Sequence, residues 1–147
     1  KDVLVLPAAA SGKVYMIGRK KEYFLLENRG AEPGGYDLSI DRPGLAVYHV
    51  DESGGDTGHG VIVGVPGAEC CGAAAPDNGA GAPCRPGRLL FHAGDTIGPD
   101  YKNQNAYSGG PLPLNTNWFD GEPSDIVFSK INTLSNSPII TVTVGYW

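Results

Sequence analysis

Residues 22–28, EYFLLEN, and residues 45–50, LAVYHV, decide how this chain folds. Both are short runs of mostly apolar and aromatic side chains, with no glycine or proline inside them. Such runs are typical of strands buried in the interior of a β-sheet. The sequence therefore predicts two central strands here, and the other segments are interpreted around them.

Further short segments have the length and composition of strands. They are residues 2–6, 13–17, 61–65, 88–92, 125–131 and 138–144. Glycine and proline, at 22 and 12 residues, separate these segments, and no stretch of about ten residues has the apolar period of a helix. We expect an all-β fold, an antiparallel β-sandwich of about seven or eight strands with long Gly/Pro-rich loops.

The last two of these segments predict an antiparallel hairpin. Strict alternation places three side chains on one face of its first strand and three on the other. The first set is Ile126, Phe128 and Lys130, and the second is Val127, Ser129 and Ile131.

Length and charge narrow the class of protein. With 147 residues, 41% hydrophobic and 18% charged, we expect one β-sandwich-like domain over residues 1–147. A net charge of -5, with one basic run at residues 19–21 that we interpret as a solvated turn, predicts that the chain does not bind nucleic acid.

No apolar stretch approaches the ~20 residues of a membrane span. The start at Lys1, without methionine or signal peptide, predicts a piece excised from a longer protein.

A charged cluster is expected where the two central strands end. On an extended strand His49 and Asp51 share one face, and so do Glu27 and Arg29. If the strands pair, these four residues form one cluster at the sheet end. Such a cluster is a metal site or an acid/base pair in the functional interpretation, and an ion-paired strand end in the structural one, which we favour.

Calcium is the metal that the loops favour. Aspartates next to glycine supply the oxygen ligands and flexible turns that Ca²⁺ uses, and the best pairs are Asp51 with Asp56 and Asp95 with Asp100. None of them has the EF-hand spacing. Aspartate also begins turns on its own account.

Residues 66–87 form an Ala/Gly/Pro-rich loop that holds all three cysteines. A disulfide from Cys70 or Cys71 to Cys84, with Cys71 and Cys84 as the candidate pair, closes a loop of about 14 residues and stabilises it by ~3 kcal/mol. A zinc site made of the three cysteines and His92 is an alternative without CxxC spacing. Three free thiols are the third interpretation. A secreted protein favours the disulfide.

No catalytic motif is present, because the sequence contains neither GxSxG nor HExxH. Aromatic residues in the long loops, Tyr101, Tyr107, Trp118 and Phe119, suit stacking on a sugar ring, and they suit plugs of the core equally well.

The phrases SGKVYMIGRKKEYFLLENRGAEPGGYD and PGLAVYHVDES resemble the segment downstream of the zinc site in secreted immune inhibitor A-like metallopeptidases. The family's version is of the form EYFLLENR…GYD…GLLIWHVDE. GDTIGPDY and the ending NTNWFDGEPSDIVFSKINTLSNSPIITVTV are also similar to the family's. The resemblance covers nearly the whole chain and is strongest over residues 22–51 and 114–144. Residues 66–87 depart from the family pattern.

The resemblance implies a function without catalysis by this chain. The family holds zinc with HExxHxxGxxH, whereas this chain has only His49, His59 and His92, none so spaced. No catalytic residue is therefore carried over, and zinc is expected only in an upstream catalytic unit.

We thus expect a secreted, non-catalytic β-rich module that supports the catalytic domain of the same polypeptide, contributes to the cleft for its protein substrate and binds structural calcium. The alternative is a free-standing β-sandwich binding module for carbohydrate or a cell-surface ligand. An independent hydrolase is the third hypothesis.

Overall fold

The computed structural model describes seven segments of the chain. They are residues 1–8, 11–30, 44–53, 61–64, 90–101, 115–133 and 138–146. No α-helix occurs within these segments, and hence none long and apolar enough to cross a membrane.

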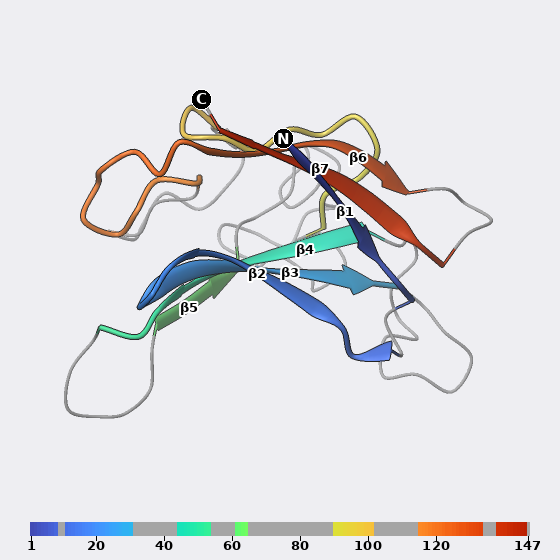
Figure 1. The fold of residues 1–147 in the computed structure, drawn as a ribbon, viewed down its shortest axis with the longest axis horizontal. Helices are drawn as coiled ribbons and strands as arrows, with labels where there is room; N and C mark the ends of the chain where they lie inside the picture. Colours follow the sequence, from blue (N-terminus) through green and yellow to red (C-terminus); the bar gives the residue numbers. More distant parts are fainter. Residues whose placement is uncertain are drawn as a thin grey trace, which may run out of the picture.

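Seven strands follow one another in the described segments. They are β1 (Asp2–Leu6), β2 (Val14–Arg19), β3 (Glu22–Arg29), β4 (Gly44–Asp51), β5 (Val61–Gly64), β6 (Ile126–Thr133) and β7 (Ile140–Tyr146). They form a three-stranded sheet in the order β1-β7-β6 and a four-stranded sheet in the order β2-β3-β4-β5. Every pairing is antiparallel, and the two sheets lie in two layers (Figure 1). The predicted all-β, antiparallel class is confirmed.

One hydrophobic core contains side chains from both sheets. In β3, which the sequence predicted as a central strand, buried and half-buried residues alternate along the whole strand, and Phe24 and Leu26 are fully buried. The largest buried side chains of the other strands join them: Leu6, Leu45, Val47, Phe128, Ile140 and Val142. Burial of one such side chain stabilises the fold by about 1.5–3 kcal/mol.

A β-bulge interrupts the predicted alternation of β6. The register with β7 shifts between Ser129 and Asn132, and Lys130 takes a positive φ of 50°. The extra residue turns Ile131 inward, where it is 3% exposed, on the same side as Phe128. The β6–β7 hairpin is confirmed, but the predicted placement of Ile131 on the face opposite Phe128 is wrong.

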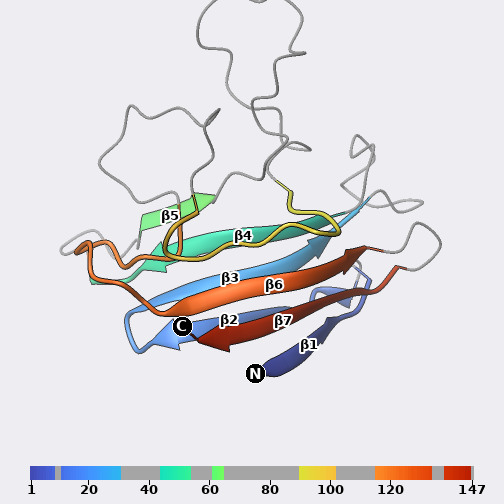
Figure 2. The same ribbon diagram turned by 90° about the horizontal axis from the view of Figure 1, so that it is seen from above.

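Residues 90–101 close one side of the core. Phe91 exchanges two backbone hydrogen bonds of 2.8 Å with Leu45 in β4, and Ile97 exchanges two of 2.8 Å with Phe128 in β6. The segment therefore runs from one sheet to the other (Figure 2). A strand was predicted over residues 88–92, but the described part of this segment makes only an isolated bridge at Phe91.

Two polar side chains join the sheets on the opposite side. The Tyr15 hydroxyl of β2 donates to the Val5 carbonyl of β1 at 3.1 Å. The buried Asn28 amide of β3 donates to the carbonyls of Pro7, at 2.9 Å, and Pro138, at 2.7 Å. These bonds tie β2 to β1, and β3 to the residues just after β1 and just before β7.

Candidate functional site

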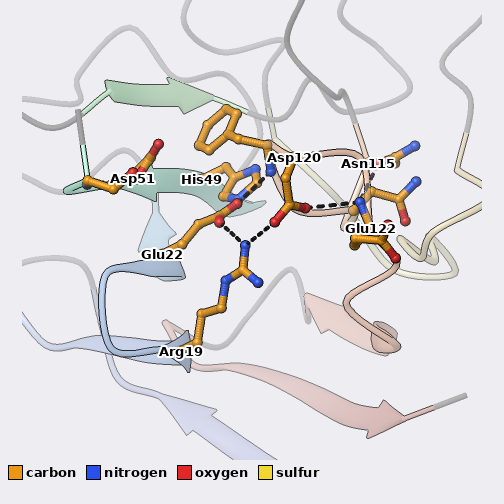
Figure 3. A network of polar contacts seen from close by, with 10 residues as sticks. Arg19, Glu22, His49, Asp51, Asn115, Asp120 and Glu122 are labelled. Carbon is orange, nitrogen blue, oxygen red and sulfur yellow. Dashed lines mark hydrogen bonds and ion pairs between the residues drawn. The ribbon is translucent and has the colours of Figure 1, made fainter. Parts of the chain in front are cut away.

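A buried polar cluster lies where β2, β3 and β4 meet. The β3–β4 register sets Glu22 opposite Asp51 and Phe24 opposite His49, so Glu22 and His49 both share the inward face of Phe24. Arg19, the last residue of β2, lies opposite Glu22 across a two-residue turn. The inward face of this sheet therefore ends in charged groups rather than in apolar ones (Figure 3).

Glu22 is the centre of this cluster. Its side chain is only 7% exposed. The Oε1 atom accepts hydrogen bonds from His49 Nε2 at 2.9 Å and from the Phe119 backbone N–H at 2.6 Å. The Oε2 atom accepts a hydrogen bond from the Arg19 guanidinium at 2.5 Å. A buried carboxylate needs such partners, because an unpaired charge in the interior is strongly destabilising.

Arg19 connects this carboxylate to the surface. Its guanidinium also donates to Asp120 Oδ2 at 2.9 Å, and it lies 4.5 Å from the centre of the Trp118 ring. The hydrogen bond from Arg19 holds the pKa of Asp120 below its ordinary value. Because Arg19 is about half exposed, the contact with Asp120 is screened by solvent and contributes little to stability.

His49 is enclosed by aromatic rings. Its imidazole, with no exposed surface, stacks on Phe119 at 3.9 Å between ring centres and on Phe24 at 4.4 Å. The Nδ1 atom has no hydrogen-bond partner among the residues that the structure describes. Burial lowers the pKa of His49 more strongly than Glu22 raises it. The ring is therefore neutral near pH 7, and the network assigns its proton to Nε2, as donor to Glu22.

Residues 115–122 form a short strap over the cluster. Within it the Trp118 N–H donates to the Glu122 carbonyl and the Gly121 N–H to the Trp118 carbonyl, both at 2.9 Å. The buried Thr116 hydroxyl donates to the Ile126 carbonyl at 2.7 Å, which joins the strap to β6. The strap thus places Trp118 in the core and Phe119 over His49. The polar cluster holds the strap against the four-stranded sheet, and no face of the imidazole is open to a substrate.

The structure does not bring the four residues of the predicted charged cluster together. Antiparallel pairing puts Glu27 and Arg29 at the opposite end of β3 from His49 and Asp51, and on the outward face. There Arg29 Nη1 lies 3.5 Å from Glu27 Oε2, and both side chains contact the Tyr48 hydroxyl. The prediction is wrong because it considered which residues share a face within each strand, and not the register that sets which residues of the two strands lie opposite each other.

Two of the predicted calcium ligands, Asp51 and Asp95, accept hydrogen bonds from neighbouring residues of the chain. Asp51 Oδ1 accepts hydrogen bonds from the N–H and the hydroxyl of Ser53, which lower the pKa of Asp51. Asp95 Oδ2 accepts the His92 N–H at 2.7 Å, and Asp100 is exposed. Asp56 lies outside the described residues. Within the described ranges no three His, Cys, Asp or Glu side chains gather as one group.

Two of the predicted stacking residues pack inward. Trp118 is 9% exposed and belongs to the core, where its ring stacks on Phe24 at 5.8 Å. Tyr101 is half-buried against Phe91, at 5.6 Å edge to face, and burial raises its pKa to about 12. The role of core plug, which was the alternative for these rings, is the one that the structure assigns to them. Tyr107 lies outside the described residues.

The cysteine predictions cannot be placed in the described part of the chain. Residues 66–87, with the candidate disulfide of Cys71 and Cys84 and with Cys70, lie outside it. His92, the fourth residue of the alternative zinc site, is described and is buried at 3% exposure.

Sequence reasoning missed Arg19 and Glu22. The basic run 19–21 was interpreted as a solvated turn, which holds for Lys20 and Lys21, both exposed in the β2–β3 turn. The sequence does indicate a role for Glu22, because on an extended strand it lies on the same face as Phe24 and Leu26. A carboxylate on such an inward face needs hydrogen-bond partners. Its neighbour across the hairpin, Arg19, was the natural candidate.

Comparison of the chain with protein-family models, with curated proteins and with solved structures finds no match.

Proposed function

We propose that this chain is a non-catalytic β-rich module, a two-layer β-sandwich, that supports the catalytic unit of a secreted zinc metallopeptidase. The resemblance of residues 22–51 and 114–144 to the segment downstream of the zinc site supports the identity of the parent enzyme. The observation that carries the non-catalytic role is the enclosure of His49. The most strongly paired group of titratable side chains in the described chain joins the four-stranded sheet to the strap, and its imidazole is covered by Phe119.

The longer polypeptide tests this proposal. We expect its gene to encode an HExxH-containing segment upstream of Lys1. The purified full polypeptide should hold zinc and cleave protein substrates, and a chelator should abolish that cleavage. Residues 1–147 alone should show no cleavage. Chelator-sensitive cleavage by residues 1–147 would instead support an independent hydrolase, and an unrelated upstream sequence would remove the metallopeptidase proposal.

The alternative, a free-standing module that binds carbohydrate, loses its expected stacking residue in Trp118, because that ring is inside the core. A glycan array probed with residues 1–147 still decides it. Binding that persists in a folded Tyr48→Phe variant but is lost on removal of an exposed aromatic ring would favour that alternative.

A further inference from the structure

Residues 120 and 121 form the only Asp-Gly step in the sequence. The step lies in the strap, where the Asp120 side chain is 52% exposed. Gly121 takes a positive φ of 89°, and no atom of the described chain, its sequence neighbours aside, lies within 4 Å of the place of an added β-carbon. A side chain at that place would hinder the approach of another group to the backbone nitrogen. Of the aspartates in the sequence, Asp120 is thus the one whose following nitrogen has no side chain beside it.

An aspartate followed by glycine can rearrange with no reagent but water. The Gly121 nitrogen attacks the Asp120 Cγ atom, a C–N bond forms, and the carboxyl hydroxyl leaves with the amide proton as water. Hydrolysis of the resulting succinimide ring then breaks one of the two bonds between its nitrogen and a ring carbonyl. One cleavage restores aspartate, and the other leaves isoaspartate, in which the backbone runs through the former side chain. The attack requires a protonated carboxyl group, because an ionised one has no adequate leaving group, and a nitrogen that is free to move.

The folded strap holds both reacting groups back (Figure 3). Asp120 Oδ2 accepts a hydrogen bond from Arg19 at 2.9 Å, and Oδ1 accepts one from the Glu122 N–H at 3.0 Å. These bonds, with Arg19 as the larger cause, keep the pKa of Asp120 below its ordinary value, so the carboxyl group is ionised. The Gly121 N–H donates to the carbonyl of Trp118 at 2.9 Å, and Trp118 is packed in the core. The rearrangement therefore requires that the strap open first.

We propose that Asp120 is a site of slow spontaneous isomerisation to isoaspartate, that Arg19 restrains the reaction, and that isomerisation releases the strap from Glu22. Only molecules whose strap is open react, so the rate depends on how often the contacts of the strap with Arg19 and Glu22 break. None of these steps needs a metal or a partner.

The release follows from the geometry of the strap. Isoaspartate adds a methylene group to the backbone at position 120 and moves the carboxylate to a different branch. The Phe119 N–H, which donates to Glu22 at 2.6 Å, directly precedes the lengthened unit. The hydrogen bond of 2.9 Å from the Trp118 N–H to the Glu122 carbonyl spans it. Because hydrogen bonds weaken steeply with distance and angle, the longer backbone breaks both, and the buried carboxylate loses a donor.

Prolonged incubation in mildly acidic buffer, well below the unfolding temperature of each protein, tests the restraint. Isoaspartate at position 120 is quantified by chromatography and electron-transfer dissociation of proteolytic peptides, because the rearrangement leaves the mass unchanged. The samples are residues 1–147 as wild type, Arg19→Gln and Arg29→Gln, together with a synthetic peptide of residues 115–125. Arg29→Gln is the matched control, since Arg29 pairs with Glu27 on the outward face. Circular dichroism confirms that each variant is folded.

We expect the peptide to isomerise about tenfold faster than the folded wild type, because only the open strap reacts. Arg19→Gln should isomerise about threefold faster than the wild type, the effect of losing an exposed ion pair, and Arg29→Gln at the wild-type rate. Absence of isoaspartate at position 120 from all samples overturns the site. Equal rates for the peptide and the wild type overturn the protection by the strap, a comparison that needs no variant. Equal rates for the two arginine variants overturn the role of Arg19.

Hydrogen exchange of the aged protein tests the release of the strap. The isoaspartate form is separated from the unaltered form, and amide exchange is followed by mass spectrometry. We expect faster exchange over residues 115–122 in the isoaspartate form and unchanged exchange in β7. Asp120→Glu is the control for other effects of ageing, because its carboxyl group is one methylene further from the backbone and does not form the succinimide. Exchange over the strap that is the same in both forms, or that rises equally in aged Asp120→Glu, overturns the release.

Discussion

Glu22 is the residue on which the polar part of the interior depends. Its carboxylate receives hydrogen bonds from three different parts of the chain: Arg19 in β2, His49 in β4 and the strap at Phe119. Glu27 in the same strand also pairs with an arginine, but its side chain is 32% exposed. The two glutamates therefore offer a direct comparison of a buried and a solvated ion pair.

Glu22→Gln should lower the free energy of unfolding by about 2 kcal/mol, because hydrogen bonds to a charged acceptor are lost inside the protein. Glu27→Gln should cost less than about 1 kcal/mol, the range for exposed pairs. Urea unfolding of the three proteins measures both changes. Equal losses for the two variants would show that Glu22 has no special role.

Acid should destabilise the fold through His49. Burial lowers the folded-state pKa of His49 below 6.5, its ordinary value. Below pH 6.5 the unfolded chain then binds a proton that the folded chain does not, so stability is complete above pH 6.5 and is lost as the pH falls towards the folded-state pKa. Asp51 and Asp120, whose folded-state pKa values lie below the ordinary 3.8, add a further loss only as the pH falls through those lower values.

Thermal unfolding from pH 8 to pH 5 measures this dependence. We expect the unfolding temperature of the wild type to decrease as the pH drops below 6.5. The unfolding temperature of His49→Gln should change less over the same range. The variant keeps a donor for Glu22 but does not titrate. Parallel curves for the two proteins would assign the acid sensitivity to another group.

At the scale of elements, the segments that cross between the sheets matter as much as the strands. The strap at residues 115–122 and the segment at residues 90–101 each contact both sheets. The second of these needs Gly44, because a β-carbon there would lie 2.6 Å from Leu90 Cβ and 2.9 Å from the Phe91 carbonyl oxygen. The strand pairing at Leu45 therefore depends on a glycine beside it.

Gly44→Ala should destabilise the protein by about 1–3 kcal/mol, the cost of forcing extra volume into a packed interior. Gly145→Ala is the control, since the nearest atom to its added β-carbon is Lys1 Cγ at 3.9 Å. Denaturant midpoints of the two variants give the comparison. A Gly44→Ala protein as stable as Gly145→Ala would mean that the 90–101 segment moves aside at no cost.

At the scale of the whole molecule, the larger core cluster of the described residues, which both sheets share, predicts one cooperative unfolding transition, so a ligand bound at any loop changes the same unfolding midpoint. Structural calcium at Asp51–Asp56 or Asp95–Asp100 remains a prediction. EDTA should lower the midpoint and Ca²⁺ should restore it, with a stabilisation of about 2.7 kcal/mol at a hundredfold excess over Kd. Mg²⁺ at the same concentration is the control, and a midpoint that neither EDTA nor Ca²⁺ moves contradicts the prediction.

The sequence by itself determined the strands, apart from residues 88–92, and the alternation of their faces, apart from the bulge in β6. Apolar runs broken by glycine and proline, and the alternation along β3, depend only on neighbours in the chain, because side chains of an extended strand alternate by geometry. The C-terminal hairpin was predictable for the same reason.

The tertiary structure alone decided which charges meet. The register between β3 and β4 places Glu27 and Arg29 at the opposite end of the sheet from His49 and on its other face. The bulge in β6 turns the side chain of Ile131 from the outward to the inward face. The strap brought the Phe119 N–H onto the buried Glu22 carboxylate and Asp120 onto Arg19, each across about one hundred residues of chain. Contacts of this kind depend on the closure of long loops and the fit of a shared core, which no local pattern of residues encodes.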